Sequence, residues 1–221
     1  MQRHFEEELD GLKTNLIKMG SLTEEAIQFS IKALIENDTA LAQRILDREN
    51  RINALEIEID NAIVDILALR QPVAVDLRLI LAVQKINNDL ERIGDHAVNI
   101  AESVITIASL EDREQLIYIP QMASLAEKML RDALDSFIHN DPKLGMSVLE
   151  NDDAIDEMNK TIFHRAIERM KNNQRTIEMG MHLIRVSRNL ERIADLATNI
   201  AEEVIFISQA RVVKHHAEEK K

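Results

Sequence analysis

The chain repeats itself, and this repeat constrains its fold more than any other feature of the sequence. Residues 90–102 read LERIGDHAVNIAE and residues 190–202 read LERIADLATNIAE, so ten of thirteen positions are identical at an offset of 100 residues. A period near 100 residues is too long for the stacked units of a solenoid. The sequence therefore predicts a duplicated domain.

The earlier part of each half matches at a slightly larger offset. Asn37-Asp38 aligns with Asn140-Asp141, which is an offset of 103 residues. The second half has therefore lost three residues relative to the first, between its second and third elements. We expect the first copy to span residues 1–112 and the second copy to span residues 113–221.

Each copy is predicted to be helical. Only 8 of the 221 residues are Gly or Pro, against about 12% in an average protein, so turns are few and elements long. Apolar residues recur every three or four positions, and no stretch alternates as a strand would. Gly20-Ser21 with Glu24 is a capping pattern that could begin a new helix inside the first one. The expected architecture is all-α, two tandem antiparallel three-helix bundles, with helices at 4–36, 38–70, 73–110, 120–139, 142–171 and 175–211.

Acidic and amide side chains form a stripe on the third helix of each copy. At about 100° per residue, four such positions fall within an arc of about 80°, beside an apolar flank. These residues are Glu91, Asp95, Asn99 and Glu102 in the first copy and Glu191, Asp195, Asn199 and Glu202 in the second. The preceding helix offers a partner stripe, with Glu49, Asn53, Glu56 and Asp60 in the first copy and Asp152, Asp156, Asn159 and Phe163 in the second.

Two interpretations of these stripes are open. Two adjacent helices can converge four to six oxygen ligands on one hard cation, and carboxylates without thiolates suit Mg, Mn, Fe or Ca. Alternatively, acidic residues at this spacing are common on solvated helix faces, and Arg92 and Arg192 can pair with Asp95 and Asp195. The recurrence of the whole pattern at equivalent positions favours the metal site. The seven His residues add no ligand pattern, since His96 faces away from the arc.

Composition and charge exclude several classes of protein. The net charge is −12, which argues against nucleic acid as a partner, because duplex binding depends on Lys and Arg. Zero cysteines excludes disulfides, thiolate metal sites and cysteine nucleophiles. The longest uncharged stretch, residues 115–126, is too short to span a bilayer, and the N-terminus lacks the apolar core of a signal peptide. We expect a cytoplasmic protein with no direct membrane insertion.

Motifs of catalysis are also missing from the sequence. The five glycines are isolated, so there is neither a dinucleotide-binding motif nor a phosphate loop, and there is no nucleophile elbow or zinc-protease motif. A carboxylate-bridged metal oxidase is a weaker alternative, because no Glu-x-x-His pair of the ferritin type occurs. The prediction is a binding or regulatory protein and not an enzyme.

Specific runs of residues resemble the PhoU family of phosphate-transport accessory and regulatory proteins. RQPVAVDLR at residues 70–78, followed by LERIGD at 90–95, is similar to the family pattern, and RTI at 175–177 followed by LERIAD at 190–195 matches it again. The resemblance extends from about residue 5 to residue 210 and includes the two-fold repeat.

The resemblance implies a fold and a function beyond those that the residues themselves predict. PhoU-like proteins consist of two similar three-helix bundles that bind metal clusters on paired E/D-x-x-x-D motifs. They restrain high-affinity phosphate uptake and the phosphate-starvation response by contacting the ATPase subunit of the phosphate transporter and a sensor histidine kinase. The resemblance thus implies a place at the inner face of the membrane through these partners, and it leaves a homodimer open.

The family's motifs transfer to eight positions of this sequence. The implied metal ligands, for Fe, Zn, Mg or Mn, are Glu49, Asn53, Glu91, Asp95, Asp152, Asp156, Glu191 and Asp195, with Asn99, Glu102, Asn199 and Glu202 as additional candidates. Because Asn53 is a weaker ligand than Asp156, we expect the first site to bind metal less tightly. The leading hypothesis is a metal-binding phosphate-signalling adaptor. Its rival is a metal-independent helical scaffold whose acidic face meets a basic partner directly.

Overall fold

The computed structural model describes residues 2–110, 116 and 118–209, and its regular elements are all helical. No strand occurs within these residues, so the predicted all-α class is confirmed. The helices are α1 (Gln2–Glu36), α2 (Thr39–Arg70), α3 (Ala74–Ile107), α4 (Ile119–His139), α5 (Pro142–Leu149), α6 (Asp152–Asn172) and α7 (Ile177–Gln209), and a 3₁₀ turn (Gln174–Thr176) precedes α7.

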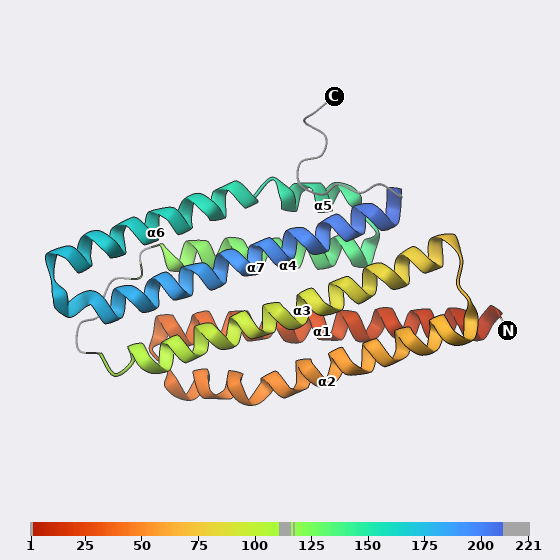
Figure 1. The fold of residues 1–221 in the computed structure, drawn as a ribbon, viewed down its shortest axis with the longest axis horizontal. Coiled ribbons are helices and arrows are strands. Elements are labelled where there is room, and N and C mark those ends of the chain that lie inside the picture. The colour runs from red at the N-terminus through yellow and green to blue at the C-terminus, as the bar shows by residue number, and fades with distance from the viewer. Residues whose placement is uncertain (1, 111–115, 117, 210–221) are drawn as a thin grey trace, which may run out of the picture.

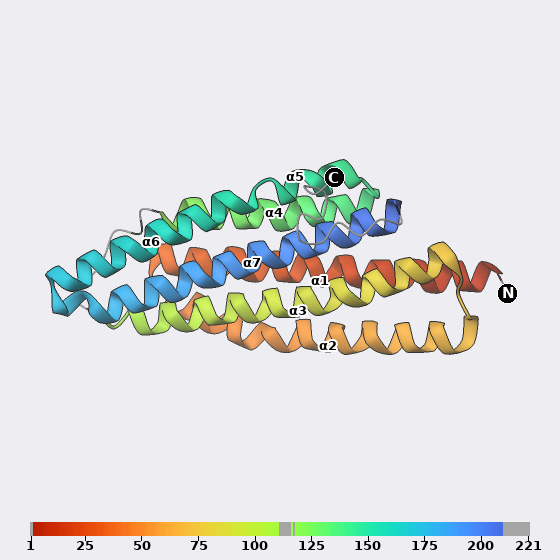
Figure 2. The ribbon, with the colours of Figure 1, turned by 45° about the horizontal axis from the view of Figure 1, so that its top comes forward.

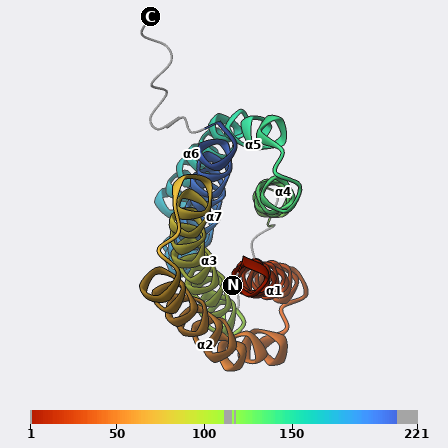
Figure 3. The same cartoon turned by 90° about the vertical axis from the view of Figure 1, so that its right-hand side faces the viewer.

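The helices form two antiparallel bundles that lie side by side along the long axis of the molecule (Figure 1). Helices α1, α2 and α3 make the first bundle, and α4, α5, α6 and α7 make the second. The bundles meet through two pairs of helices, α3 with α7 and α1 with α4. Seen end-on, α3 and α7 lie toward one side and α1 and α4 toward the other, with α2 at one end and α5 and α6 at the opposite end (Figure 3).

The duplicated Asn-Asp dipeptides make the same turn in both repeats. Asn37 and Asn140 adopt the left-handed conformation, with φ of 56° and 50°, which Asn tolerates better than most residues. Asp38 and Asp141 then cap the following helices, each accepting a hydrogen bond from the backbone N–H three residues later, at 2.9 and 3.3 Å. The alignment at an offset of 103 residues is therefore an equivalence of structure.

The predicted helix over residues 142–171 is wrong as a single element, because α5 ends at Leu149 and α6 begins at Asp152. Asn151 lies in the turn between them, where its amide donates to the Ser147 carbonyl at 2.7 Å. Two adjacent carboxylates, Asp152 and Asp153, then occupy the first turn of α6, where the positive end of the helix dipole favours them. Polar residues at the end of α5 and the start of α6 thus break the helix, although the spacing of apolar residues continues through this point.

The capping pattern at Gly20-Ser21 does not begin a new helix. Helix α1 is continuous, and the Ser21 hydroxyl donates to the Ile17 carbonyl inside it. Other ends agree with the predicted bounds within about three residues, which is normal at helix termini. The predicted domain boundary at residues 112/113 and the predicted helix end at residue 211 lie outside the described residues.

The core is aliphatic and continues across both repeats, as the shortage of aromatic residues leads us to expect. Its centre is the antiparallel contact of α3 with α7. His96 meets Asn189 at 2.9 Å and Lys85 meets Glu203 at 2.8 Å, so the two helices cross near Ile93 and its equivalent Ile193, both fully buried. The repeats are therefore related by a pseudo-two-fold axis near these two residues, and α3 and α7 lie side by side in the middle of the molecule (Figures 1 and 2). Within the described residues, no helix is long and apolar enough to span a membrane.

Candidate functional site

The acidic stripes of α2 and α3 face each other in the first repeat. Burial raises the pKa of Glu91 above its ordinary value, and the charges of Asp95, Glu56 and Glu49 raise it further. Burial also raises the pKa of Glu56, followed by the charges of Asp60 and Asp95. The charges of five carboxylates from two helices therefore act on one another. We call them the first acidic cluster: Glu49, Glu56, Asp60, Glu91 and Asp95.

Two features of α3 bring α2 close enough to form this cluster. Gly94 is buried against Ile52, and a Cβ added at Gly94 would lie 3.1 Å from the Ile52 Cδ1 atom. Asn87, which is fully buried, donates to the Asp60 carboxylate at 3.0 Å and to the Glu56 carbonyl at 3.1 Å. A glycine and a buried amide thus fix the spacing and the register of the two stripes.

The outer end of the α3 stripe is occupied by a side chain from the other repeat. Arg185 of α7 donates to the Asn99 amide oxygen at 2.8 Å and to the Glu102 carboxylate at 2.6 Å. The additional candidates Asn99 and Glu102 therefore pair with a guanidinium between the repeats. Arg185 is beyond reach of sequence reasoning, because the contact joins positions more than 80 residues apart.

The second repeat places its stripe on α6 and α7, and basic side chains enter it. Asp195 pairs with Arg192 at 3.0 Å, as expected from their spacing, whereas Arg92 of the first repeat pairs with Asp89 at 3.7 Å and not with Asp95. Lys160 binds Glu157, and the charges of Asp156 and Asp153 also raise the Lys160 pKa.

The remaining predicted residues of the second repeat lie along the same stripe. Asn159 accepts a hydrogen bond from Ser187 of α7 at 2.8 Å, which joins the two helices. Asp152 lies at the first turn of α6 and is half-buried, like Glu191 and Glu202, while Asn199 is exposed. In the first repeat Asn53 is half-buried on α2.

The side chains of the first acidic cluster have the right chemistry to bind a cation, but they are not arranged as a complete metal-coordination site. Among the residues that the structure describes, no three His, Asp or Glu side chains stand together as a metal would hold them. The donor set of the first acidic cluster is entirely carboxylate, which hard cations prefer, and mutual repulsion would be relieved by a bound cation. Sequence reasoning underrated Glu56 and Asp60, although both lie on the predicted partner stripe.

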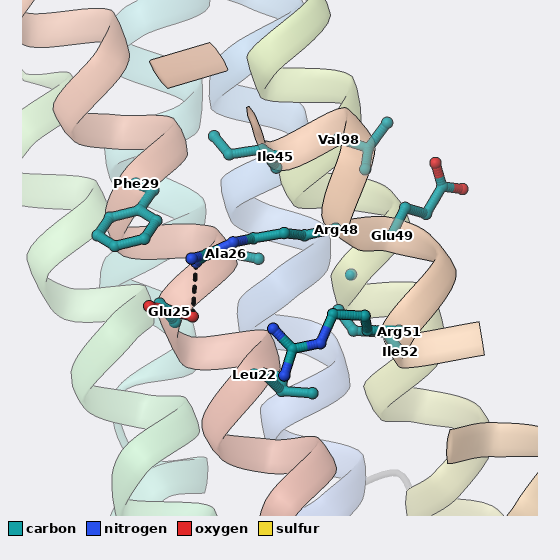
Figure 4. Close-up of a pocket in the computed structure, with 11 residues that line it drawn as sticks. Leu22, Glu25, Ala26, Phe29, Ile45, Arg48, Glu49, Arg51, Ile52 and Val98 are labelled. Carbon is teal, nitrogen blue, oxygen red and sulfur yellow. Dashed lines mark ion pairs between the residues drawn. The ribbon is translucent and has the colours of Figure 1, made fainter. Parts of the chain in front are cut away.

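A shallow pocket adjoins the first acidic cluster, between α1, α2 and α3 (Figure 4). Arg48 covers it, pairing with Glu25 at 2.7 Å and lying 5.3 Å above the centre of the Phe29 ring. Glu49, the next residue on α2, extends the other way, toward Val98 of α3. The Arg48 guanidinium therefore pairs with Glu25 of α1 inside the pocket and not with the neighbouring carboxylates of the first acidic cluster.

Comparison with known proteins agrees with this duplicated architecture. The PhoU domain family model matches the chain twice, over residues 16–104 and residues 119–204. The chain belongs to the PhoU family. A PhoU homolog of Zymomonas mobilis, named a phosphate-specific transport system accessory protein, is 36% identical and aligns over 94% of this chain and 87% of its own.

Solved PhoU structures have the same fold. The crystal structure of PhoU from Pseudomonas aeruginosa superposes with a TM-score of 0.90 at 37% identity, covering 94% of this chain and all of that one. The phosphate transport system regulatory protein PhoU from Streptococcus pneumoniae gives a TM-score of 0.88 at 29% identity, covering 95% and 99% of the two chains. The predicted PhoU-like pair of bundles is therefore confirmed.

Proposed function

We propose that this chain regulates phosphate transport as an accessory protein that binds partners and performs no catalysis. The observation that supports this most is the match of the PhoU domain to both repeats, together with relatives named as accessory proteins of phosphate-specific transport. In this role the protein restrains phosphate uptake and the starvation response when phosphate is plentiful. Its partners are the transporter's ATPase subunit and a sensor histidine kinase, which it contacts from the cytoplasm at the inner face of the membrane.

A genetic test decides the regulatory role. Deleting the gene for this chain should switch on a phosphate-starvation promoter reporter in phosphate-rich medium, and the wild-type gene should switch it off again. A reporter that remains phosphate-regulated without the gene would contradict the proposal.

We further propose that the first acidic cluster binds a divalent or trivalent cation, with Fe, Zn, Mg or Mn as candidates. Its five carboxylates repel one another, so a cation there would relieve a cost that the folded protein already bears. Asn53 is a weak ligand, which predicts looser binding in the first repeat than at Asp156. The larger number of carboxylates predicts tighter binding in the first repeat. This effect is the stronger one, because Lys160 and Arg192 already supply positive charge to the acidic stripe of the second repeat.

Elemental analysis tests the metal directly. Protein purified without chelators should contain metal, and Glu91→Gln with Asp95→Gln should lose most of it. Metal-free wild-type protein with no measurable Mn²⁺ affinity would refute this part of the proposal and leave the regulatory role intact.

A metal-independent scaffold is the second candidate, and the separation of the carboxylates favours it. In that case the acidic face meets a basic partner directly. Capture of the ATPase subunit with and without a chelator separates the two candidates, because only the metal-binding adaptor should lose its partner on chelation.

A further inference from the structure

The outer face of α2 displays apolar side chains to solvent in a regular pattern. Ile57 and Val64 are 60% and 61% exposed, and the positions that continue their line along the helix are exposed as well. Their spacing alternates between three and four residues, which is the a/d spacing of a coiled-coil seam. We call this set the α2 stripe: Ala54, Ile57, Asn61, Val64 and Ala68.

Among the residues that the structure describes, no helix covers the α2 stripe. Helix α2 packs on α1 and α3 through its opposite side, where Ile52, Leu55, Ile59, Ile63 and Ile66 are buried. The views along and across the long axis both place α2 at the edge of the molecule (Figures 1 and 3). One helix thus presents two apolar seams, one used by the core and one left on the surface.

The second repeat provides an internal control for this pattern. The positions of α6 equivalent to the α2 stripe, at the offset of 103 residues, are mostly charged or polar: Glu157, Lys160, His164, Ile167 and Lys171. The same scaffold therefore tolerates an ordinary solvated surface at these positions. The apolar surface of α2 is a property of the first repeat and not a requirement of the fold.

Acidic side chains border the α2 stripe on both sides. Glu58 and Asp65 are exposed along one border. The α2 members of the first acidic cluster, Glu49, Glu56 and Asp60, lie along the other, toward α3. Between residues 49 and 65 the sole basic residue is Arg51. A partner that covers the stripe must bring positive charge to both borders, and a second copy of α2 would bring negative charge instead.

We propose that the α2 stripe is a docking site for a basic amphipathic helix of a protein partner. The apolar seam of that helix packs against Ile57 and Val64, and its Lys or Arg residues on both sides meet Glu58, Asp65 and the first acidic cluster. Asn61, a polar residue at an a-type position, fixes the register of the two helices. The inference rests on the proposed adaptor function, and it identifies the surface of the first repeat that binds a partner.

A designed peptide serves as the probe. It has three heptads with Leu at a and d and Lys at e and g, and it carries a fluorescent label so that anisotropy reports binding to the full chain. One control peptide has Glu in place of every Lys, and another has the Lys peptide's composition in scrambled order. We expect the Lys peptide to bind at least about tenfold more tightly than either control.

Two double variants locate the site. Ile57→Lys with Val64→Lys, which places a positive charge at the two large apolar side chains of the α2 stripe, should weaken binding of the Lys peptide by about tenfold or more. Phe163→Lys with Met181→Lys changes two exposed apolar residues of the second repeat, and binding should remain within about twofold. Equal binding by both variants, or equal binding of the scrambled and ordered peptides, would overturn the proposal. A concentration-dependent dimer that the α2 variant abolishes would also overturn it, in favour of a second copy as the occupant.

The phosphate reporter separates this inference from the proposed function. The α2 variant should leave the reporter switched on in phosphate-rich medium, while the Phe163→Lys, Met181→Lys variant should switch it off. Full repression by the α2 variant would refute docking at α2 and leave the regulatory role standing. Failure of the wild-type gene to repress would refute the regulatory role, whatever the peptide shows.

Discussion

Residue 57 of α2 and residue 160 of α6 hold the same place in the two repeats, yet Ile57 is apolar and Lys160 is a cation. Lys160 pairs with Glu157 at 2.7 Å and also interacts with the charges of Asp156 and Asp153. Ile57 is uncharged and cannot compensate the negative charge of the acidic residues around it. Lys160 thus partly neutralises the acidic stripe of the second repeat, while the first acidic cluster keeps its negative charge.

The central crossing of α3 and α7 shows no such difference in charge. Inside the molecule the repeats agree, because Ile93 and Ile193 are both fully buried near the pseudo-two-fold axis and the Asn-Asp turns have the same geometry. The comparison teaches that the two repeats share their turns and the residues of their central crossing, and that they differ in the charge carried by the outer faces of α2 and α6.

The largest expected effect tests the agreement inside the molecule. Ile93→Ala and Ile193→Ala should each lower the free energy of unfolding by about 3 kcal/mol, because each leaves a cavity in a closely packed site. Urea unfolding of the full chain measures both. If the two values differ by more than about half of that amount, the central contact is not symmetric and the equivalence of the repeats fails.

A smaller effect distinguishes the helix pairs. Gly94 lies against Ile52, whereas its equivalent is Ala194. Gly94→Val should destabilise the fold by about 2 kcal/mol, since the added methyl groups must displace the Ile52 side chain. Ala194→Gly should cost about 1 to 2 kcal/mol, through helix propensity and through the loss of a fully buried methyl group. Unfolding in urea gives both values, and a neutral Gly94→Val would show that α2 and α3 are not held at the close spacing described here.

The smallest effect concerns pH. Burial and the neighbouring carboxylates raise the pKa of Glu91 above its ordinary value of 4.5, so the folded state holds this proton more tightly than the unfolded state. Its contribution to stability is therefore greatest at low pH and falls as the pH rises from 4.5 through the raised pKa. Glu91→Gln should flatten the fall of the melting temperature over that range. A melting temperature that falls as steeply in Glu91→Gln as in the wild type over that range would contradict the burial of this carboxyl among like charges.

Much of the fold could be predicted from the sequence because its determinants are local. Apolar residues at helical spacing and the paired Asn-Asp turns predict the helices and their duplication. The apolar pattern does not predict the break after Leu149, because it runs through it from Val148 to Ile155. The break is marked only by the Asn151 amide, which donates to the Ser147 carbonyl of α5, and by the two aspartates in the first turn of α6.

The site was predicted less completely because its decisive contacts join distant residues. Spacing alone placed Glu91 and Asp95 on one arc and Glu49 on the facing helix, and the pKa shifts agree that these charges interact. Spacing could not show that Arg185 of the other repeat holds Asn99 and Glu102. The contrast between Ile57 and Lys160 was visible in the aligned halves, but its meaning depends on which side of α2 faces the core.

Titration calorimetry with Mn²⁺ tests the central claim, that the first acidic cluster is the stronger cation site. The proteins to compare are the wild type, Glu91→Gln with Asp95→Gln, and Glu191→Gln with Asp195→Gln. The first pair of substitutions should remove the tightest Mn²⁺ binding, and the second pair should leave it in place. Loss of the tightest binding in the second variant with its retention in the first would contradict the account.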